Sequence, residues 1–199
     1  MSLLGYQQAL CDLIASPASC LQLRGGDTAV LDGYDLDDRD RRRLRTVVSQ
    51  RGMSTACTLY RVNRITPIFT LLPLTCFLLG DDLIGEAEAF WQETVATDLQ
   101  FSPEASRFAA FVRQRIEEGA VDNPYVEEVM ELELALNRVN FAGRAERGET
   151  RVRFRHDPEA LLGPLSRRQL PPEPPAEGEF WVVVDASGPE VELRAEGAG

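Results

Sequence analysis

The chain has 199 residues, of which 44% are hydrophobic and 27% are charged. This is ordinary globular usage, so fibrous, collagen-like and wholly disordered classes are excluded and a sizeable core is expected. The chain has 32 acidic and 21 basic residues, and its formal net charge of −11 disfavours non-specific binding to nucleic acid or anionic membranes. The single histidine, His156, excludes a multi-histidine metal centre and argues against catalysis within this chain.

The cysteines and the apolar segments bear on the cellular compartment. Cys11, Cys20, Cys57 and Cys76 form no CxxC pair and lie in apolar or helix-like stretches, which favours buried, reduced thiols. A four-cysteine zinc site or two disulfides remain open alternatives. The N-terminus has no secretory signal pattern, and the most apolar stretch, residues 65–79, is shorter than the ~20 residues that span a bilayer. The sequence therefore predicts a soluble, cytoplasmic protein.

The first part of the chain is expected to be helical. A stripe of apolar residues over 6–14 predicts a helix that ends before Pro17. A second helix is expected from about 37 to 50, with Gly52 as its stop, and Ser54 is expected to cap a third.

Further helices are expected up to about residue 140. Thr66-Pro67 is typical of a helix start, and Pro73 should kink the following apolar segment or split it in two. Helical spacing of apolar residues predicts three more helices, over 83–95, 102–119 and 123–139.

Beyond Phe141 the pattern changes to that of short strands. Strict alternation over 150–155 predicts a half-buried strand, and Asp157-Pro158-Glu159 is expected to cap a short helix. A proline-rich connector at 171–175 precedes two β-rich segments, 180–184 and 191–193, which a hairpin turn at 187–190 should join.

These elements together predict an α+β fold that is mainly α. A helical body is followed by a small C-terminal antiparallel sheet of two or three strands. We expect two domains, a helical one over residues 1–141 and a small β-rich one with the proline-rich connector over residues 142–199.

The small sheet is the first candidate binding site. Two or three strands leave edge N–H and C=O groups unpaired, and such an edge can accept an extended peptide as an added strand. Arginines at alternate positions of the first strand would line one face and contact acidic peptide side chains. The peptide-binding residues predicted on these strands are Arg151, Arg153, Arg155, Phe180, Val182, Val183 and Val184. The alternative is a sheet that only covers the helical body, with its arginines in water.

A second candidate is the segment Tyr60-Arg61-Val62-Asn63-Arg64. Helical spacing places Arg61 and Arg64 one turn apart, beside Tyr60 and Asn63 and next to the most apolar part of the chain. Paired guanidinium groups suit a carboxylate-rich partner protein or an internal salt bridge, and both alternatives stay open.

Other motifs have simpler explanations. The basic run over residues 39–45 is interleaved with acidic residues from Asp35 to Asp40, so a solvated helix face is favoured over a phosphate-binding patch. The chain contains no GxSxG, no GxGxxG and no phosphate-binding loop. A DNA-binding regulator and a stand-alone enzyme that works without histidine are the remaining functional alternatives.

The order of several short motifs resembles a known family. They occur over about residues 57–140, which is under half of the chain: Leu59-Tyr60-Arg61-Val62-Asn63-Arg64, Leu72-Pro73-Leu74, Leu78-Leu79-Gly80-Asp81-Asp82, Ala89-Phe90-Trp91, Ser106-Arg107-Phe108-Ala109-Ala110-Phe111-Val112, Asn123-Pro124-Tyr125-Val126 and Met130-Glu131-Leu132-Glu133-Leu134-Ala135. This order resembles the HvfC-like family, the partner proteins of multinuclear non-heme iron oxidative enzymes. Relatives include the TglI and MbnC types of ribosomal peptide natural-product pathways.

The resemblance implies a non-catalytic subunit that forms a heterodimer with the iron enzyme. The chain itself would hold no cofactor, because the iron belongs to the partner. The helical domain would dock on the enzyme, and the C-terminal sheet would bind the leader of a ribosomal precursor peptide that the enzyme modifies, often at cysteine. The resemblance transfers no individual binding residues, so those named above rest on physical reasoning alone.

Overall fold

The computed structural model describes residues 3–94, 101–141, 148–188 and 190–197. By its contacts the chain divides into two compact units, residues 1–65 and residues 66–199. The fold is α+β and mainly α, as the sequence predicts, with one three-stranded antiparallel sheet near the C-terminus.

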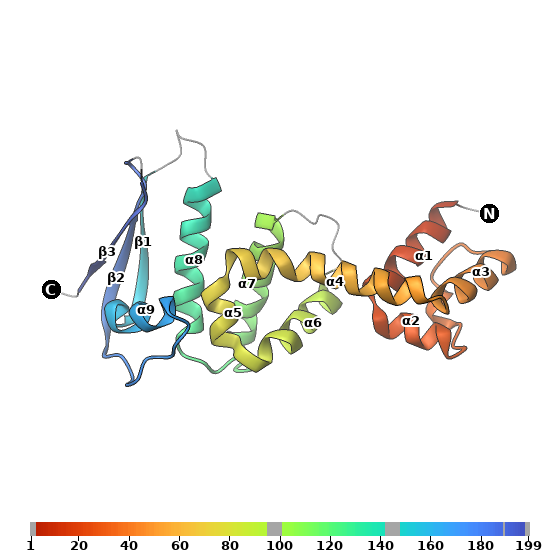
Figure 1. Ribbon diagram of the computed structural model, residues 1–199, viewed down its shortest axis with the longest axis horizontal. Helices are drawn as coiled ribbons and strands as arrows, with labels where there is room; N and C mark the ends of the chain where they lie inside the picture. The colour runs from red at the N-terminus through yellow and green to blue at the C-terminus, as the bar shows by residue number, and fades with distance from the viewer. Residues whose placement is uncertain (1–2, 95–100, 142–147, 189, 198–199) are drawn as a thin grey trace. The chain divides into compact units, whose positions relative to one another are not determined.

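The first unit is built from short helices. Its elements are α1 (Leu3–Ala15), α2 (Pro17–Arg24), the 3-10 turn η1 (Ala29–Leu31), α3 (Asp38–Val48) and the first part of α4 (Arg51–Leu71). Helices α1, α2 and α3 contact one another (Figure 1). The side chains of Ser16 and Asp37 cap the N-termini of α2 and α3, respectively. Both are residue types that accept the unpaired N–H groups of a first turn.

A hydrophobic cluster forms the core of the first unit. It comprises only residues of this unit: Ala9, Leu13, Cys20, Leu23, Leu31, Leu44, Val48, Met53 and Cys57. Burial of the cysteines is confirmed for Cys20 and Cys57 and, in the second unit, for Cys76. For Cys11 the expectation is wrong, because this residue is exposed. Cys11 lies on the outer side of α1, away from the buried Ala9 and Leu13.

Three expectations about the region of α4 are wrong. Ser54 and Gly52 lie inside the helix rather than at a cap or a stop, and Thr66-Pro67 does not begin a new helix because α4 continues through Pro67. Proline inside a helix removes one backbone hydrogen bond. Pro67 and Ile68 are both buried, so packing of this apolar face sustains the helix there. Pro73 does split the apolar segment, since α4 ends at Leu71 and Pro73 is the first residue of α5.

The second unit continues after α4 with a series of helices that ends with α8. They are α5 (Pro73–Leu79), the 3-10 turn η2 (Gly80–Asp82), α6 (Leu83–Glu93), α7 (Phe101–Glu117) and α8 (Val126–Phe141). Phe90 of α6 lies edge-on to Phe108 of α7 with ring centroids 5.5 Å apart. Helix α8 contacts α5, α7 and the sheet, and therefore joins the helices to the strands. The predicted helix over 83–95 extends to Val95, which lies outside the described residues.

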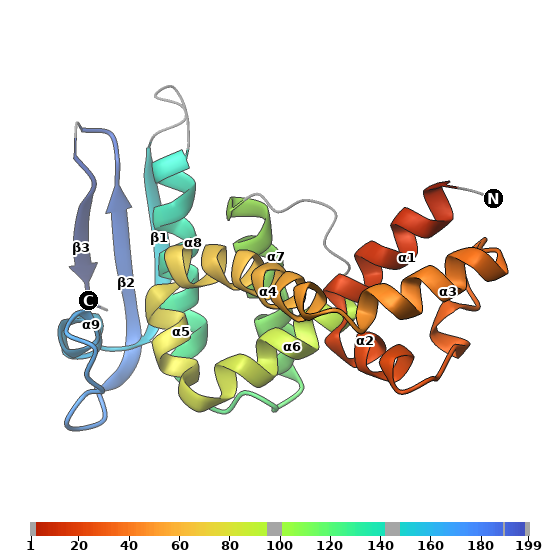
Figure 2. The same cartoon turned by 45° about the vertical axis from the view of Figure 1, so that its right-hand side comes forward.

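The sheet consists of β1 (Glu149–His156), β2 (Glu177–Asp185) and β3 (Glu192–Glu196) in the order β1-β2-β3 (Figure 2). The short helix α9 (Pro158–Ser166) connects β1 to the proline-rich segment before β2, and Asp157 caps it as predicted. Both strand pairs are antiparallel, and the first has an irregularity between Phe154 and His156. The predicted turn at 187–190 includes residue 189, which is outside the described residues.

The sheet belongs to the same compact unit as α5 to α8. Helix α8 packs against β1 and β2, and α9 packs against β2. The domain boundary expected between residues 141 and 142 falls at the edge of residues 142–147, which the structure does not describe. The two compact units divide after Ile65.

No single helix among the described residues is long and apolar enough to cross a membrane; α4 and the following stretch to Glu93 pass that test only together, as a pair bent by 106°.

Candidate functional site

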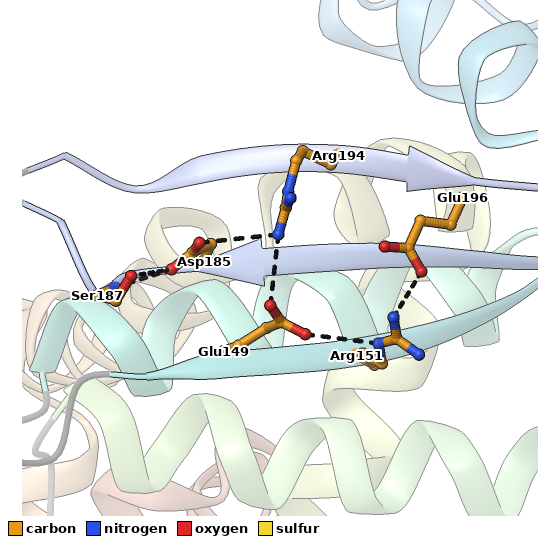
Figure 3. Close-up of polar contacts among 6 residues, drawn as sticks. All are labelled: Glu149, Arg151, Asp185, Ser187, Arg194 and Glu196. Carbon is orange, nitrogen blue, oxygen red and sulfur yellow. Dashed lines mark hydrogen bonds and ion pairs between the residues drawn. The ribbon is translucent and has the colours of Figure 1, made fainter.

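One face of the sheet carries a network of ion pairs that reaches across the central strand (Figure 3). Arg151 of β1 lies 2.7 Å from Glu196 of β3 and 3.6 Å from Glu149. Arg194 of β3 lies 3.3 Å from Glu149 and 3.8 Å from Asp185 of β2. The network therefore joins the two edge strands through side chains that cross β2.

The strand register shows what lies beneath this network. Val183 of β2 is opposite Arg151 on β1 and opposite Arg194 on β3. Directly opposed residues of an antiparallel pair point to the same face, so Val183 lies between the two arginines. Its side chain is fully buried. The long arginine side chains thus cover an apolar position while their charged ends stay near solvent.

Asp185 is fixed at one end of the network. Its carboxylate accepts hydrogen bonds from the Ser187 hydroxyl at 2.6 Å and from the Ser187 backbone N–H at 2.9 Å. The hydroxyl first, and then the backbone N–H, lower the pKa of Asp185 below its ordinary value. Asp185 is therefore a carboxylate at neutral pH and a stable partner for Arg194.

The three arginines predicted to bind peptide are exposed, and each has an acidic neighbour in the chain. Arg153 lies 3.4 Å from Glu179 and Arg155 lies 3.1 Å from Glu127, while Arg151 belongs to the network described above. Exposed ion pairs of this kind contribute less than about 1 kcal/mol, so an acidic ligand can replace the internal carboxylate at low cost.

The predicted residues on β2 do not lie at a sheet edge. Strand β2 is central and pairs with a neighbour on each side. Val182, Val183 and Val184 are buried, and Phe180 is half-buried. These four residues therefore form the apolar interior of the sheet, and the open edges belong to β1 and β3.

A groove runs along the outer edge of β1. It has a volume of about 290 Å³ and is lined by one face of α8 and by β1. The α8 wall includes Glu127, Glu131 and Arg138, and the β1 wall includes all three predicted arginines. Arg113 of α7 forms an ion pair with Glu131 and so supports the α8 wall. An extended ligand here would meet a strand edge on one side and a helix with charged side chains on the other.

Glu128 closes one end of this edge. One carboxylate oxygen accepts a hydrogen bond from the backbone N–H of Arg155 at 2.7 Å. The other oxygen lies 2.8 Å from Nδ1 of His156. The Tyr125 ring packs edge-on against His156 with centroids 4.9 Å apart. The chain's only histidine is therefore held in a mostly buried pair with a carboxylate, where it fixes the end of β1.

The second edge of the sheet is formed by β3. Its residues from Glu192 to Ala195 are exposed, including Leu193, whose side chain is 50% exposed. Helix α8 lies against β1 and β2, whereas no described helix makes more than slight contact with β3. The sheet thus offers one edge beside a groove and one edge that faces solvent.

The second candidate site of the sequence is only partly at the surface. Arg64 is buried, with 1% of its surface exposed, so its guanidinium is inside the protein. Tyr60 and Arg61 are half-buried, and of the four predicted residues Asn63 is the exposed one. For Arg64 the structure therefore favours the internal alternative over contact with a partner.

The basic run on α3 is balanced by acidic neighbours. Arg41 lies 3.1 Å from Asp32, and Arg43 lies 4.0 Å from Asp40. This arrangement agrees with the solvated helix face that the sequence favours over a phosphate-binding patch.

The glutamates of the groove were not singled out as a site by the sequence. Glu127, Glu131 and Arg138 recur at helical spacing on the face of α8 that lines the groove, which is a signal that the sequence contains. That this face borders a strand edge depends on the packing of α8 against β1, and no local pattern encodes that packing.

In comparisons with known proteins, no family model matches this chain and no curated protein matches its sequence.

Proposed function

We propose that this chain is a non-catalytic partner of a multinuclear non-heme iron oxidative enzyme, and that its sheet binds an extended segment of a ribosomal precursor peptide. The observation that carries the proposal is the outer edge of β1 beside the groove formed with α8. The motif order in the sequence supplies the kind of enzyme and the kind of peptide.

The groove supplies both components of strand recognition. An added strand gains affinity from main-chain hydrogen bonds to the β1 edge and specificity from side chains that line the groove. Arg151, Arg153 and Arg155 would contact acidic side chains of the peptide, and the glutamates of α8 would contact basic ones. The backbone N–H of Arg155 already donates a hydrogen bond to Glu128. The proposed docking edge is therefore the segment of β1 from Glu149 to Phe154.

The single histidine bears on which of the two proteins would hold the iron. Non-heme iron sites of oxidative enzymes commonly use imidazole ligands. This chain has one histidine, and Glu128 holds it at the end of β1. We therefore assign the iron to the partner enzyme and peptide binding to this chain, with the helical region as the docking surface for the enzyme.

Co-expression tests the partnership. The tagged chain is expressed with the products of its genomic neighbours, purified, sized and analysed for iron. We expect a one-to-one complex whose partner holds iron and which retains the precursor peptide. A metal-free monomer that captures neither an enzyme nor a peptide would overturn the proposal.

A matched pair of variants tests which edge binds the peptide. Arg153 lines the groove, and Arg194 lies on the same sheet face but outside the groove lining. With the labelled precursor peptide from the co-expression, Arg153→Ala should weaken binding about five- to tenfold, and Arg194→Ala should leave it nearly unchanged. Fluorescence anisotropy measures the affinity, and far-UV circular dichroism checks the fold. A larger loss of affinity in Arg194→Ala than in Arg153→Ala would indicate that the peptide binds at β3 instead.

A further inference from the structure

Two cysteines line the same cavity inside the first unit. Cys20 comes from α2 and Cys57 from α4, and both belong to the hydrophobic core with 3% and 7% of their surfaces exposed. Burial first, and then the nearby thiol of Cys20, raise the pKa of the Cys57 thiol. This thiol also lies 3.8 Å from the backbone oxygen of Leu13. The two cysteines thus share one core cluster and line one cavity although they lie far apart in the sequence.

The thiol pair borders a small cavity. The cavity has a volume of about 220 Å³ and is lined by Cys20, Cys57, Ser54 and Thr58, together with Arg24 and other residues of α2 and α4. Arg24 is anchored by hydrogen bonds from Nε and Nη2 to the backbone oxygen of Val48, at 2.9 and 2.6 Å. A cavity of this size admits a water-sized reagent to the two cysteines that line it.

The other two cysteines lack this arrangement. Cys76 is buried in the second unit, where burial first and then Glu133 raise the pKa of its thiol to about 12. Cys11 is exposed on α1. These two residues provide internal controls, one buried and one exposed.

We propose that Cys20 and Cys57 are a redox modification site that closes to a disulfide when hydrogen peroxide oxidises it. One thiolate attacks a peroxide oxygen, the O–O bond breaks, and a sulfenic acid and water form. The second thiol attacks the sulfenic sulfur, the S–O bond breaks, and a second water leaves. Two thiols and one peroxide thus give one disulfide and two waters.

The disulfide would link α2 to α4 and close the chain between residues 20 and 57, which contains η1 and α3. A cross-link over such a segment restricts the unfolded chain and so stabilises the first unit. Burial, followed by the neighbouring thiol, raises the pKa of Cys57, so the reactive thiolate is a minor species at neutral pH. Oxidation is therefore expected to be slower than that of an exposed thiol.

The experiment uses the full chain carrying Cys11→Ala. Trypsin has no site before Arg24, so this substitution prevents Cys11 and Cys20 from sharing a peptide. The protein is incubated with hydrogen peroxide, alkylated under denaturing conditions and digested. We expect a peptide pair joined through Cys20 and Cys57, which dithiothreitol separates, and a melting temperature raised by roughly 5 °C or more.

Variants decide whether the pair is specific. Adding Cys76→Ala should leave the cross-link and the stabilisation intact, whereas adding Cys57→Ala or Cys57→Ser should abolish both. In these Cys57 variants dimedone should trap a sulfenic acid on Cys20, which shows access to the pair even if the fold is weakened. Peroxide-treated protein that keeps both thiols alkylatable, or that links Cys76 instead, would overturn the proposal.

Discussion

Glu128 shows how one side chain completes a strand end. The register of β1 with β2 is irregular between Phe154 and His156, and the backbone N–H of Arg155 donates to Glu128 from α8. A bulged residue leaves the ladder, so its N–H needs another acceptor. The second oxygen of the same carboxylate lies at Nδ1 of His156. One buried glutamate thus satisfies two polar groups of β1.

Replacing Glu128 should destabilise the second unit. Glu128→Ala leaves the Arg155 N–H and the His156 ring without this acceptor, and we expect a loss of about 2–3 kcal/mol in the free energy of unfolding. Glu128→Gln keeps an oxygen for one donor and should lose less. Urea unfolding followed by tryptophan fluorescence measures both. A Glu128→Ala variant as stable as the wild type would contradict this account.

Helix α5 depends on a cap from a distant helix. Pro73 at its first position has no N–H, and the preceding Leu72 offers no capping side chain. Glu133 of α8 accepts the backbone N–H groups of Leu74 at 2.6 Å and Thr75 at 2.9 Å, and the Thr75 hydroxyl at 2.7 Å. A carboxylate at this place also suits the positive end of the helix dipole. The apolar segment can therefore restart as a helix immediately after α4.

Removing this cap should destabilise α5 and lower the free energy of unfolding. Glu133→Ala leaves three donors without this acceptor, two of them buried, and we expect a loss of about 2–4 kcal/mol in the free energy of unfolding. Glu133→Gln retains an acceptor and should be milder. Thermal and urea unfolding of the two variants provide the measurement, with Glu131→Ala, a neighbouring glutamate in a partly exposed ion pair, as the matched control. Equal losses for the two alanine variants would argue against a capping role.

The pH dependence provides a second test of Glu133. Burial raises its pKa above the ordinary 4.5, and this outweighs the three hydrogen bonds that lower it. The folded protein therefore binds this proton more tightly than the unfolded chain. The stabilisation is complete below pH 4.5 and is lost as the pH rises through the folded-state pKa. Relative to Glu133→Gln, the wild type should lose stability over that range, and a constant difference would contradict the shift.

The whole molecule contains two compact units with separate groups of buried residues. The cluster of the first unit draws only on residues up to Cys57. Both tryptophans, Trp91 and Trp181, lie in the second unit. Fluorescence therefore reports on the second unit, whereas the helical circular dichroism signal includes both.

A substitution that creates a cavity in the core of the first unit tests whether the two units unfold separately. Leu44 is fully buried in the first cluster, and Leu44→Ala should lower the free energy of unfolding of that unit by about 2–5 kcal/mol. We expect the circular dichroism transition to move to lower urea while the fluorescence transition stays in place. Val182→Ala, in the sheet, is the matched change and should move the fluorescence transition. If Leu44→Ala shifts both signals together, the chain unfolds as one unit.

Some of the fold was predictable because it depends on neighbouring residues. The start of a helix near Asp37, the cap at Asp157, the break at Pro73 and the alternation along β1 each involve residues within a few positions of one another. The continuation of α4 through Pro67 was not predictable in this way, since tertiary burial of one helix face outweighs the local cost of the proline. The arginines of β1 were predicted to lie on an exposed face and do so.

The sequence by itself determined the class of fold, the alternation that exposes the β1 arginines and the single histidine that limits metal chemistry. Only the tertiary structure decided that β2 is central, that α8 forms a groove with β1, that Arg64 is buried and that Cys20 and Cys57 line one cavity. The physical reason is distance along the chain. Periodicity and the caps at Asp37 and Asp157 act between near neighbours. Strand order, burial, the cap of α5 by Glu133 and the lining of a cavity join residues tens of positions apart, which no local pattern specifies.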